Sequence, residues 1–184
     1  PNFYKMKSLK TLLTAFALFA VATATNAQEN TTITSSATVV ADIVITPVAN
    51  VNFGSIQDTG SPVLDPQGTN TADVGGSATF GKFSIAAANS TQLVIDWNQA
   101  TVTLNDGGAN NMTYTPDVSA NSTDAIATSS DVTKNTAGAA TETSAGGALF
   151  VYIGGNLGAL SSQASGTYTS ANGSGDLVFT INYQ

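Results

Sequence analysis

The stretch LVFTINY, Leu177 to Tyr183, decides the fold class because apolar residues alternate strictly along it. Successive side chains of a β-strand point to opposite faces of a sheet, so one face of this stretch is apolar throughout. The residues on that face are Leu177, Phe179, Ile181 and Tyr183. We therefore predict a strand with one buried face.

The same period of two recurs upstream, which predicts a protein built from short strands. The further strand-like ranges are 78–86, 92–97, 101–105, 111–118 and 148–153. Between them lie Gly- and Asn-rich stretches such as NDGGANN, whose residues accept the positive φ that tight turns require. No window after residue 30 has helical spacing of its apolar residues. Together these patterns predict an all-β fold, specifically an immunoglobulin-like antiparallel β-sandwich.

Three aromatic residues in these strands have two alternative interpretations, as buried core residues or as an exposed ligand-binding surface. Trp97 continues the apolar face of Leu93 and Ile95, so we interpret it as a core residue and not as a platform for sugars. Phe150 and Tyr152 lie opposite the apolar face of their strand. They form either a second buried face of a central strand, which we favour, or an exposed aromatic pair.

The first residues are typical of a secretory signal peptide, which we assign to residues 1–27. Lys5, Lys7 and Lys10 precede a short apolar run, and Ala27 ends a small-residue cleavage pattern. We expect translation to start at Met6, and a retained N-terminal anchor is the alternative. Residues 28–36 then form an N-terminal extension, and residues 37–184 form the sandwich domain.

The composition excludes several classes of function. The sequence has no histidine and no cysteine, so the commonest general base, the thiol nucleophile and the imidazole metal ligands are missing. We expect no enzymatic activity, no cofactor and no metal, and we interpret the Asp106 region as a hairpin turn in preference to a calcium loop. After signal cleavage two lysines remain against twelve acidic residues, a balance that excludes nucleic acid as a partner.

The N-terminal run alternates for longer than one strand needs. Apolar or small residues occupy the odd positions of the thirteen residues 33–45, which would form a strand about 40 Å long. A typical strand is about 17–20 Å long, so this one either bends near its start or projects beyond the domain. A projecting strand could pair with a neighbouring subunit. The candidate donor side chains are Ile33, Ala37, Val39 and Ala41.

Residues 119–146 are rich in Thr, Ser and Ala, with Ile126 and Val132 as the main large apolar residues. We predict a long surface loop with one weak strand. Long loops often carry function, so this segment motivates the alternative of a stand-alone secreted adhesion or carbohydrate-binding module.

Several short motifs occur in an order that resembles the secreted bacterial family called domain of unknown function 4402. They are VNFGSI at 51–56, the Gly-Gly of ALFVYIGGNLG, the Gly-x-Tyr of SGTYTS and the terminal TINYQ. More loosely, the chain is similar to secreted pilin domains of the spore-coat-U-like, chaperone–usher type. The fold-defining residues on this basis are Phe53, Gly54, Gly154, Gly155, Gly166, Tyr168 and Tyr183. We expect Gly154 and Gly155 to end their strand, and the Tyr168 hydroxyl to bond to the backbone as in a tyrosine corner.

The resemblance implies a structural role at the cell surface. Pilin domains of this type receive a missing strand from the N-terminal extension of a neighbour, with a chaperone and an usher as assembly partners. It also implies a secreted, periplasmic or surface location in a Gram-negative bacterium. The function expected here is therefore that of a fimbria-like subunit, whose last strand, Leu177–Tyr183, borders the groove that accepts the donor.

Overall fold

The computed structural model describes residues 36, 37, 39–68 and 71–184. The chain divides into two compact units, Pro1–Thr38 and Val39–Gln184, and every strand identified lies in the second. All strand pairs are antiparallel, and the described residues contain no α-helix, only two single 3₁₀ turns. The prediction of an all-β antiparallel protein is therefore confirmed.

The elements follow one another with connections of very different length, the longest being residues 157–178 between the last two strands. They are β1 (Val44–Ala49), β2 (Val63–Leu64), β3 (Gly81–Ala86), β4 (Leu93–Trp97), β5 (Val102–Asn105), β6 (Asn111–Asn121), η1 (Ile126–Thr128), β7 (Ser130–Asp131), η2 (Ala139–Thr141), β8 (Ala148–Asn156) and β9 (Phe179–Tyr183). No helix in the described part of the chain is long and apolar enough to span a membrane.

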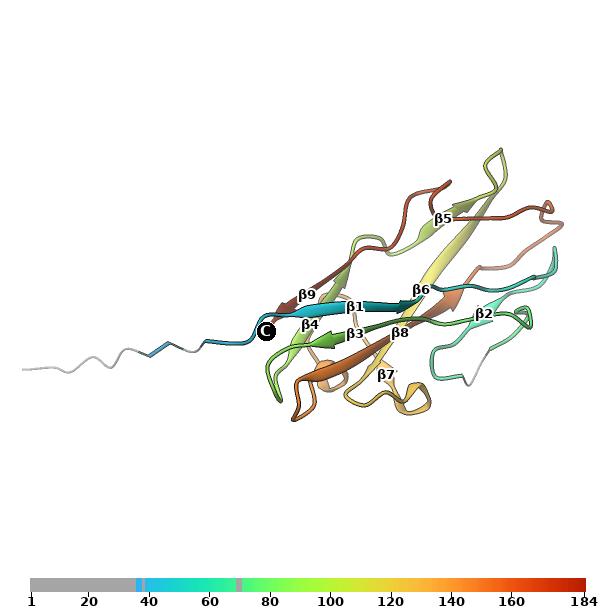
Figure 1. Ribbon diagram of the computed structural model, residues 1–184. Helices are drawn as coiled ribbons and strands as arrows, with labels where there is room; N and C mark the ends of the chain where they lie inside the picture. Colours follow the sequence, from blue (N-terminus) through green and yellow to red (C-terminus); the bar gives the residue numbers. More distant parts are fainter. Residues whose placement is uncertain (1–35, 38, 69–70) are drawn as a thin grey trace, which may run out of the picture. The chain divides into compact units, whose positions relative to one another are not determined.

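The strands form one large curled sheet and one small sheet (Figure 1). The large sheet has the order β1-β3-β8-β6-β5, like half of a barrel, with β2 paired to β8 and β7 paired to β6. The small sheet consists of β4 and β9. Because β8 lies between β3 and β6, it is a central strand, as predicted for the segment that carries Phe150 and Tyr152.

The core lies between the two sheets. Ile85, Leu149 and Val151 from the large sheet pack with Leu93 and Ile95 from the small sheet, and all five are nearly inaccessible to solvent. Trp97 belongs to the same cluster and is buried, as predicted. A second hydrophobic cluster forms at the other end of the domain, around β2, β5 and β6. Its buried members are Phe53, Leu64, Val102, Met112, Tyr114, Leu157 and Leu160.

The predicted N-terminal strand is too long. In the described residues the strand begins only at Val44, and residues 36, 37 and 39–43 are not in a strand. The alternation of side chains is present upstream, but nothing in the described residues pairs with that stretch. A strand needs a hydrogen-bonded neighbour as well as a suitable pattern. Residues 33–35 and 38 lie outside the described residues.

The prediction of a surface loop over residues 119–146 is wrong at its start and in its packing. Strand β6 runs on to Asn121, and the weak strand expected is the two-residue β7. Thr141 and Thr143 are 1% and 3% exposed, because their hydroxyls donate hydrogen bonds to the Leu93 and Ala88 carbonyls at 2.7 and 2.6 Å. Polar side chains are therefore buried here with their hydroxyls bonded to backbone carbonyls, one of β4 and one of the loop between β3 and β4.

Gly154 and Gly155 do not end their strand, as the sequence had suggested. Strand β8 continues through both to Asn156, and its neighbour on one side changes there from β3 to β2. A Cβ on Gly154 would lie 1.8 Å from the Leu64 carbonyl oxygen, and one on Gly155, whose φ is +137°, would lie 2.1 Å from the Thr115 oxygen. The two glycines thus allow a close approach of three strands.

Candidate functional site: two unpaired edge strands

Two strand edges of the domain lack a partner among the described residues, whereas comparable edges are covered. The outer edge of β5 bonds to Thr169 and Ser174, with N···O distances of 3.0 Å. The outer edge of β4 accepts hydrogen bonds from the Asn135 N–H and the Thr141 hydroxyl. The outer edges of β1 and β9 make no such backbone contact within the described ranges. Unpaired edges are sites at which another strand can add.

Strand β1 has a core-facing side that the core does not cover. Ile45 is paired with Ile85, and Pro47 with Phe83, so these side chains share the face of two buried residues. Nevertheless Ile45 is 40% exposed and Pro47 is exposed as well. An apolar side chain that points inward yet remains in solvent indicates that the sheet opposite it is too narrow.

Strand β9 borders the same gap from the other sheet. Phe179 packs against Phe83 with ring centroids 5.0 Å apart, so β9 lies across β3, the neighbour of β1. In Figure 1, β9 ends beside the start of β1, with the two arrows in opposite directions. The Tyr183 hydroxyl donates a 2.5 Å hydrogen bond to the Ala41 carbonyl and so ties the end of β9 to the segment that precedes β1.

Neither edge strand carries a charged residue. The sequences VITPVA of β1 and FTINY of β9 contain no Asp, Glu, Lys or Arg, although the whole chain has twelve acidic residues. Val44 and Val48 on β1, and Val178 next to β9, are 55%, 58% and 58% exposed. Natural edge strands that stay unpaired are typically protected by charges, especially lysine. Pro47 is the only residue of either strand that opposes pairing, since it lacks an N–H.

The candidate donor residues within the described ranges are all exposed. Ala37 and Ala41 are exposed, and Val39 is 96% exposed. Ile33 lies outside the described residues. The described donor candidates are therefore exposed but not in a strand, and Ala41 is the one that a hydrogen bond ties to the end of β9.

The early Phe-Gly pair forms a turn beside the second core cluster. Phe53 is buried against Tyr114 in an edge-to-face contact at 5.7 Å. Gly54 has a φ of +69°, and its N–H donates to the Asn52 side chain at 2.8 Å, which favours glycine at this position.

The Gly-x-Tyr motif shapes a loop. The Tyr168 hydroxyl donates to the Ala164 carbonyl and accepts from the Gln163 side chain, both at 2.8 Å. A Cβ on Gly166 would lie 3.3 Å from that of Asp106, so the glycine brings the two loops close together. These contacts are structural.

Both lysines of the described chain are held in ion pairs over aromatic rings. Lys82 lies 2.6 Å from Asp124 and 5.6 Å from the ring centre of Tyr152, whose hydroxyl donates to the same carboxylate. Lys134 is paired with Asp96 at 2.5 Å. The hydrogen bond from Lys82 holds the pKa of Asp124 below its usual range, and Lys134 does the same for Asp96.

The acidic loops do not form a metal centre. The Asp106 carboxylate accepts hydrogen bonds from Asn110 and from the Gly108 N–H, which lower its pKa, and thereby closes the β5–β6 hairpin. Burial, with the nearby charges of Asp131 and Asp65, raises the pKa of Asp117. No group of three or more His, Cys, Asp or Glu residues in the described part of the chain could hold a metal ion.

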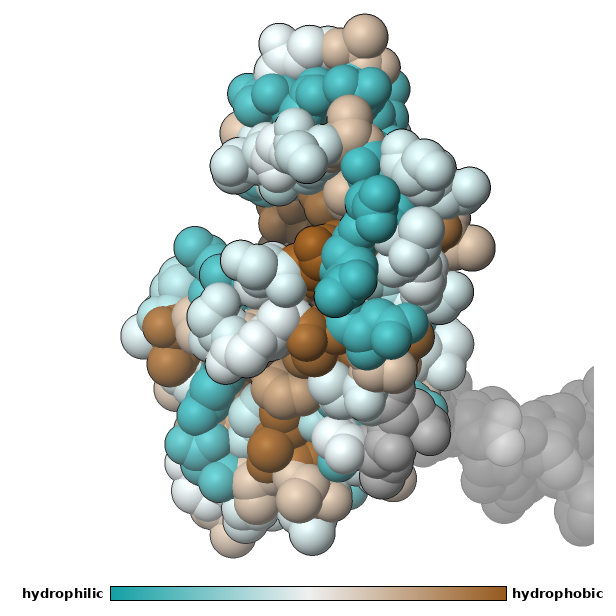
Figure 2. All heavy atoms as spheres, turned by 90° about the vertical axis from the view of Figure 1, so that its right-hand side faces the viewer, coloured by the Kyte–Doolittle hydropathy of each residue, from teal (hydrophilic) through white to brown (hydrophobic). Residues whose placement is uncertain are grey.

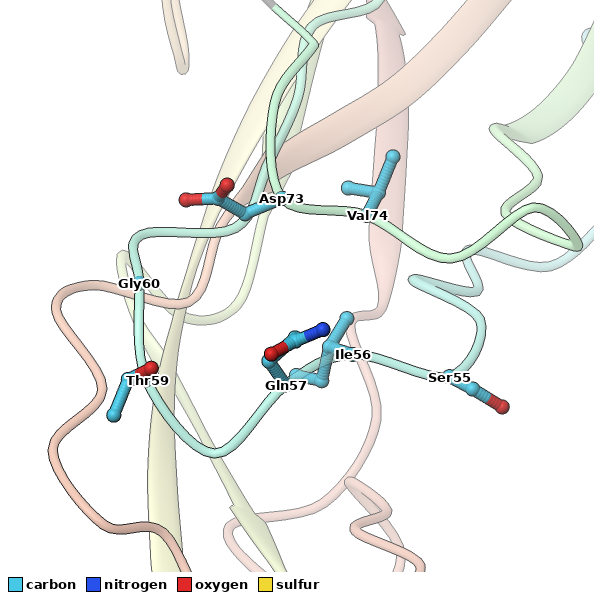
Figure 3. Close-up of a pocket in the computed structure, with 7 residues that line it drawn as sticks. All are labelled: Ser55, Ile56, Gln57, Thr59, Gly60, Asp73 and Val74. Carbon is cyan, nitrogen blue, oxygen red and sulfur yellow. The ribbon is translucent and has the colours of Figure 1, made fainter.

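A shallow pocket lies away from the edge strands, between the loops that precede and follow β2. It has a volume of about 400 Å³, and its lining residues are Ser55, Ile56, Gln57, Thr59, Gly60, Asp73 and Val74 (Figure 3). The Asp73 carboxylate points toward the Gly60 turn and accepts the Ser61 N–H at 2.9 Å. No aromatic ring lines the pocket, so it lacks the stacking surface that sugar sites use.

The end of the domain at which β2 lies is mostly polar on its surface (Figure 2). Apolar surface is visible there in a hollow between polar lobes. The polar side chains that line the nearby pocket are Ser55, Gln57, Thr59 and Asp73.

The acceptor groove expected beside Leu177–Tyr183 stays a prediction, and β1 was not singled out from the sequence as an edge. The missed signal is the absence of charge in VITPVA, because an edge strand that stays exposed is expected to carry charge or lysine. No family model, curated protein or solved structure matches the chain.

Proposed function

We propose that the protein is a secreted, non-enzymatic structural subunit of the cell surface that assembles by strand exchange. The N-terminal segment of one copy pairs along β9 and β1 of the next copy. The observation that carries this proposal is the exposed, core-facing side of β1, where Ile45 remains in solvent opposite the edge of β9. A strand inserted there would cover the apolar residues and satisfy both free edges.

The N-terminal segment has the side chains that such a gap requires. Its apolar residues alternate with polar ones, so one face of an inserted strand would be apolar. Burying a valine or isoleucine side chain completely contributes roughly 1.5–3 kcal/mol. Ile33 and Val39 are the two large donors on this face, and Ala37 and Ala41 fit where the sheets are close together.

The occupant is the segment of a second copy, because a chain cannot easily insert its own. To enter the gap beside its own β1, the segment would have to reverse direction immediately before Val44. Residues 37–43, ATVVADI, contain no glycine, proline or asparagine, Asp42 is their single turn-forming residue, and four of them are β-branched. Tight reversals usually need those turn residues, whereas β-branched residues favour an extended chain.

The inserted strand would form its main ladder on β9. Pro47 removes one N–H from β1, and the register of β1 with β3 shifts between Pro47 and Ala49. Strand β9 has no proline and pairs regularly with β4 over all five residues. We therefore assign most backbone hydrogen bonds of the inserted strand to β9 and most side-chain burial to the β1 side.

This proposal includes the finer fold and the partners implied by the resemblance. With the added strand, the small sheet would widen and the two sheets would form an immunoglobulin-like sandwich. A subunit with open edges needs protection during export, which is consistent with a periplasmic chaperone and an outer-membrane usher in a Gram-negative cell. What supports these statements is the pair of uncharged edges together with the motif order of the sequence.

The test compares two neighbouring residues of β1 whose side chains point to opposite faces. The exported chain, Gln28–Gln184, is analysed by size-exclusion chromatography with light scattering as wild type, Ile45→Lys and Val44→Lys. Both side chains are exposed, so both variants should fold, with unchanged circular dichroism. Lysine at Ile45 would place a charge in the gap and abolish oligomers, whereas lysine at Val44 lies on the outer face and should leave them largely intact.

Deletion of residues 28–36 should have the same effect as Ile45→Lys, and an added peptide of residues 28–41 should bind to the deleted protein. A wild-type protein that stays monomeric and ignores the peptide would contradict the proposal. That result would favour the stand-alone adhesion or carbohydrate-binding module, for which the pocket around Asp73 would be the first place to examine.

A further inference from the structure

The hydroxyl of Tyr183 connects three segments that are distant in the sequence. It donates to the Ala41 carbonyl at 2.5 Å and accepts the Ala88 N–H at 2.8 Å. Ala41 precedes β1, Ala88 lies between β3 and β4, and Tyr183 is the last residue of β9. The ring itself packs against the core cluster between the sheets.

The Ala88 backbone, which bonds to this hydroxyl, is itself held by a further hydrogen bond. The Ala88 carbonyl accepts a 2.6 Å hydrogen bond from the Thr143 hydroxyl, and Thr143 is almost completely buried. Thr143 also donates its N–H to the Thr91 carbonyl at 3.0 Å. The N–H and the carbonyl of Ala88 are thus both hydrogen-bonded. The Tyr183 hydroxyl, which accepts that N–H, therefore has a defined position from which it holds Ala41.

Ala41 is the place at which such a contact matters most. Residues 39–43 have no backbone hydrogen bond of their own among the described residues, so the hydroxyl is the polar contact that restrains this segment. A chain that turned back into its own gap would have to change direction here. A fixed carbonyl at Ala41 opposes that change.

We propose that Tyr183 is a positioning residue that fixes where the N-terminal segment leaves the domain and prevents it from pairing with its own edge strands. The segment is then available to another copy. That Tyr183 holds the segment at Ala41 is a property of the monomer alone. That the segment is thereby directed to another copy rests on the proposed function.

The experiment uses Tyr183→Phe in the exported chain, with Tyr168→Phe as the matched control. Both substitutions remove one hydroxyl that donates to a carbonyl and accepts an N–H, but the contacts of Tyr168 lie within residues 163–168. NMR relaxation of the monomer fraction measures the backbone order parameters of residues 41–43. Tyr183→Phe should lower them from about 0.85 to below about 0.6, and Tyr168→Phe should leave them unchanged.

A second readout confirms that the hydroxyl bond has been lost. The Ala88 amide loses its acceptor in Tyr183→Phe, so its hydrogen exchange should accelerate about fivefold, while the control keeps the wild-type rate. In light scattering, Tyr183→Phe should shift mass from oligomers to monomer, because the released, mobile segment samples its own edge strands and is no longer presented to another copy.

The outcomes separate this inference from the proposed function. Unchanged order parameters at residues 41–43 would overturn the inference, and so would lower order parameters with undiminished oligomers. If the wild-type protein forms no oligomers, the proposed function fails. The order parameters then still decide whether Tyr183 anchors the segment.

Discussion

At the scale of single residues, Asp117 shows how the protein tolerates an unfavourable charge. Its carboxyl group lies on β6, partly buried, and has Asp131 and Asp65 nearby, so its pKa is raised. A raised pKa means that the folded state prefers the protonated form. The ionised carboxylate therefore lowers the stability of the fold at neutral pH, and this cost disappears as the pH falls through the raised pKa toward 3.8.

We predict that Asp117→Asn stabilises the protein at pH 7 and has little effect near pH 3. Because the group is only partly buried, solvent screens its charge and the gain should be small, about 0.5 kcal/mol or roughly 1–2 °C in Tm. Thermal unfolding across this pH range measures it. Asp58→Asn removes the same charge from an exposed loop and serves as the control. An equal gain from both variants would assign the effect to net charge.

At the scale of elements, β8 organises the large sheet because it pairs with three other strands. It pairs with β3 over residues 148–153, with β2 at Gly155 and Asn156, and with β6 over residues 150–156. The Tyr114 hydroxyl donates to the Gly154 carbonyl at 2.6 Å and adds a side-chain contact at the same place. The absence of side chains at Gly154 and Gly155 lets this crowded junction form.

We predict that Gly154→Ala destabilises the protein by about 3 kcal/mol, since the new Cβ would overlap the Leu64 carbonyl oxygen. Gly138→Ala is the matched control, because its φ of −162° suits any residue and nothing lies within 4 Å of the new Cβ. Urea unfolding compares the two midpoints. A stability loss below about 1 kcal/mol for Gly154→Ala would show that β2 can move away at little cost.

The elements also show where the sequence was sufficient and where it was not. Strands with alternating residues, such as Leu149, Val151 and Ile153, were predicted because a period of two depends only on local geometry. The role of Gly154 was misjudged because its neighbours, β2 and β6, are distant in the sequence. The burial of Thr141 and Thr143 was missed for the same reason, since it depends on carbonyls of Leu93 and Ala88.

At the scale of the whole molecule, the charge balance bears on assembly. The chain has a net charge of −7, and both lysines of the described part are already paired with carboxylates. Two copies therefore repel each other at long range, although the edge strands that would meet in the proposed assembly are uncharged. The apolar edge strands of the candidate site favour contact between two copies, and their alternation is visible in part in the sequence. The net negative charge opposes that contact, and the composition shows it directly.

We predict that assembly becomes faster with added salt. Assembly through an interface built on ion pairs would become slower. The screening length falls from about 30 Å at 0.01 M to about 8 Å at 0.15 M salt, so the repulsion between copies is largely removed. The rate of oligomer formation, followed by light scattering, should rise severalfold over this range. A rate that falls with salt would indicate complementary charges at the contact and would contradict assembly through the neutral edges.

The two lysines have a further consequence, for digestion by proteases. The sequence has no arginine, so an enzyme that cuts after basic residues has only Lys82 and Lys134 available in the described part of the chain. Lys82 lies inside β3, bonded to strands on both sides, and Lys134 is held to Asp96 beside β4. Cleavage requires several residues to fit an active site as an extended chain, which the strand pairing around Lys82 does not permit while the domain is folded. The exposed turn at Lys134 is thus the one place in the described part of the chain at which such an enzyme can begin.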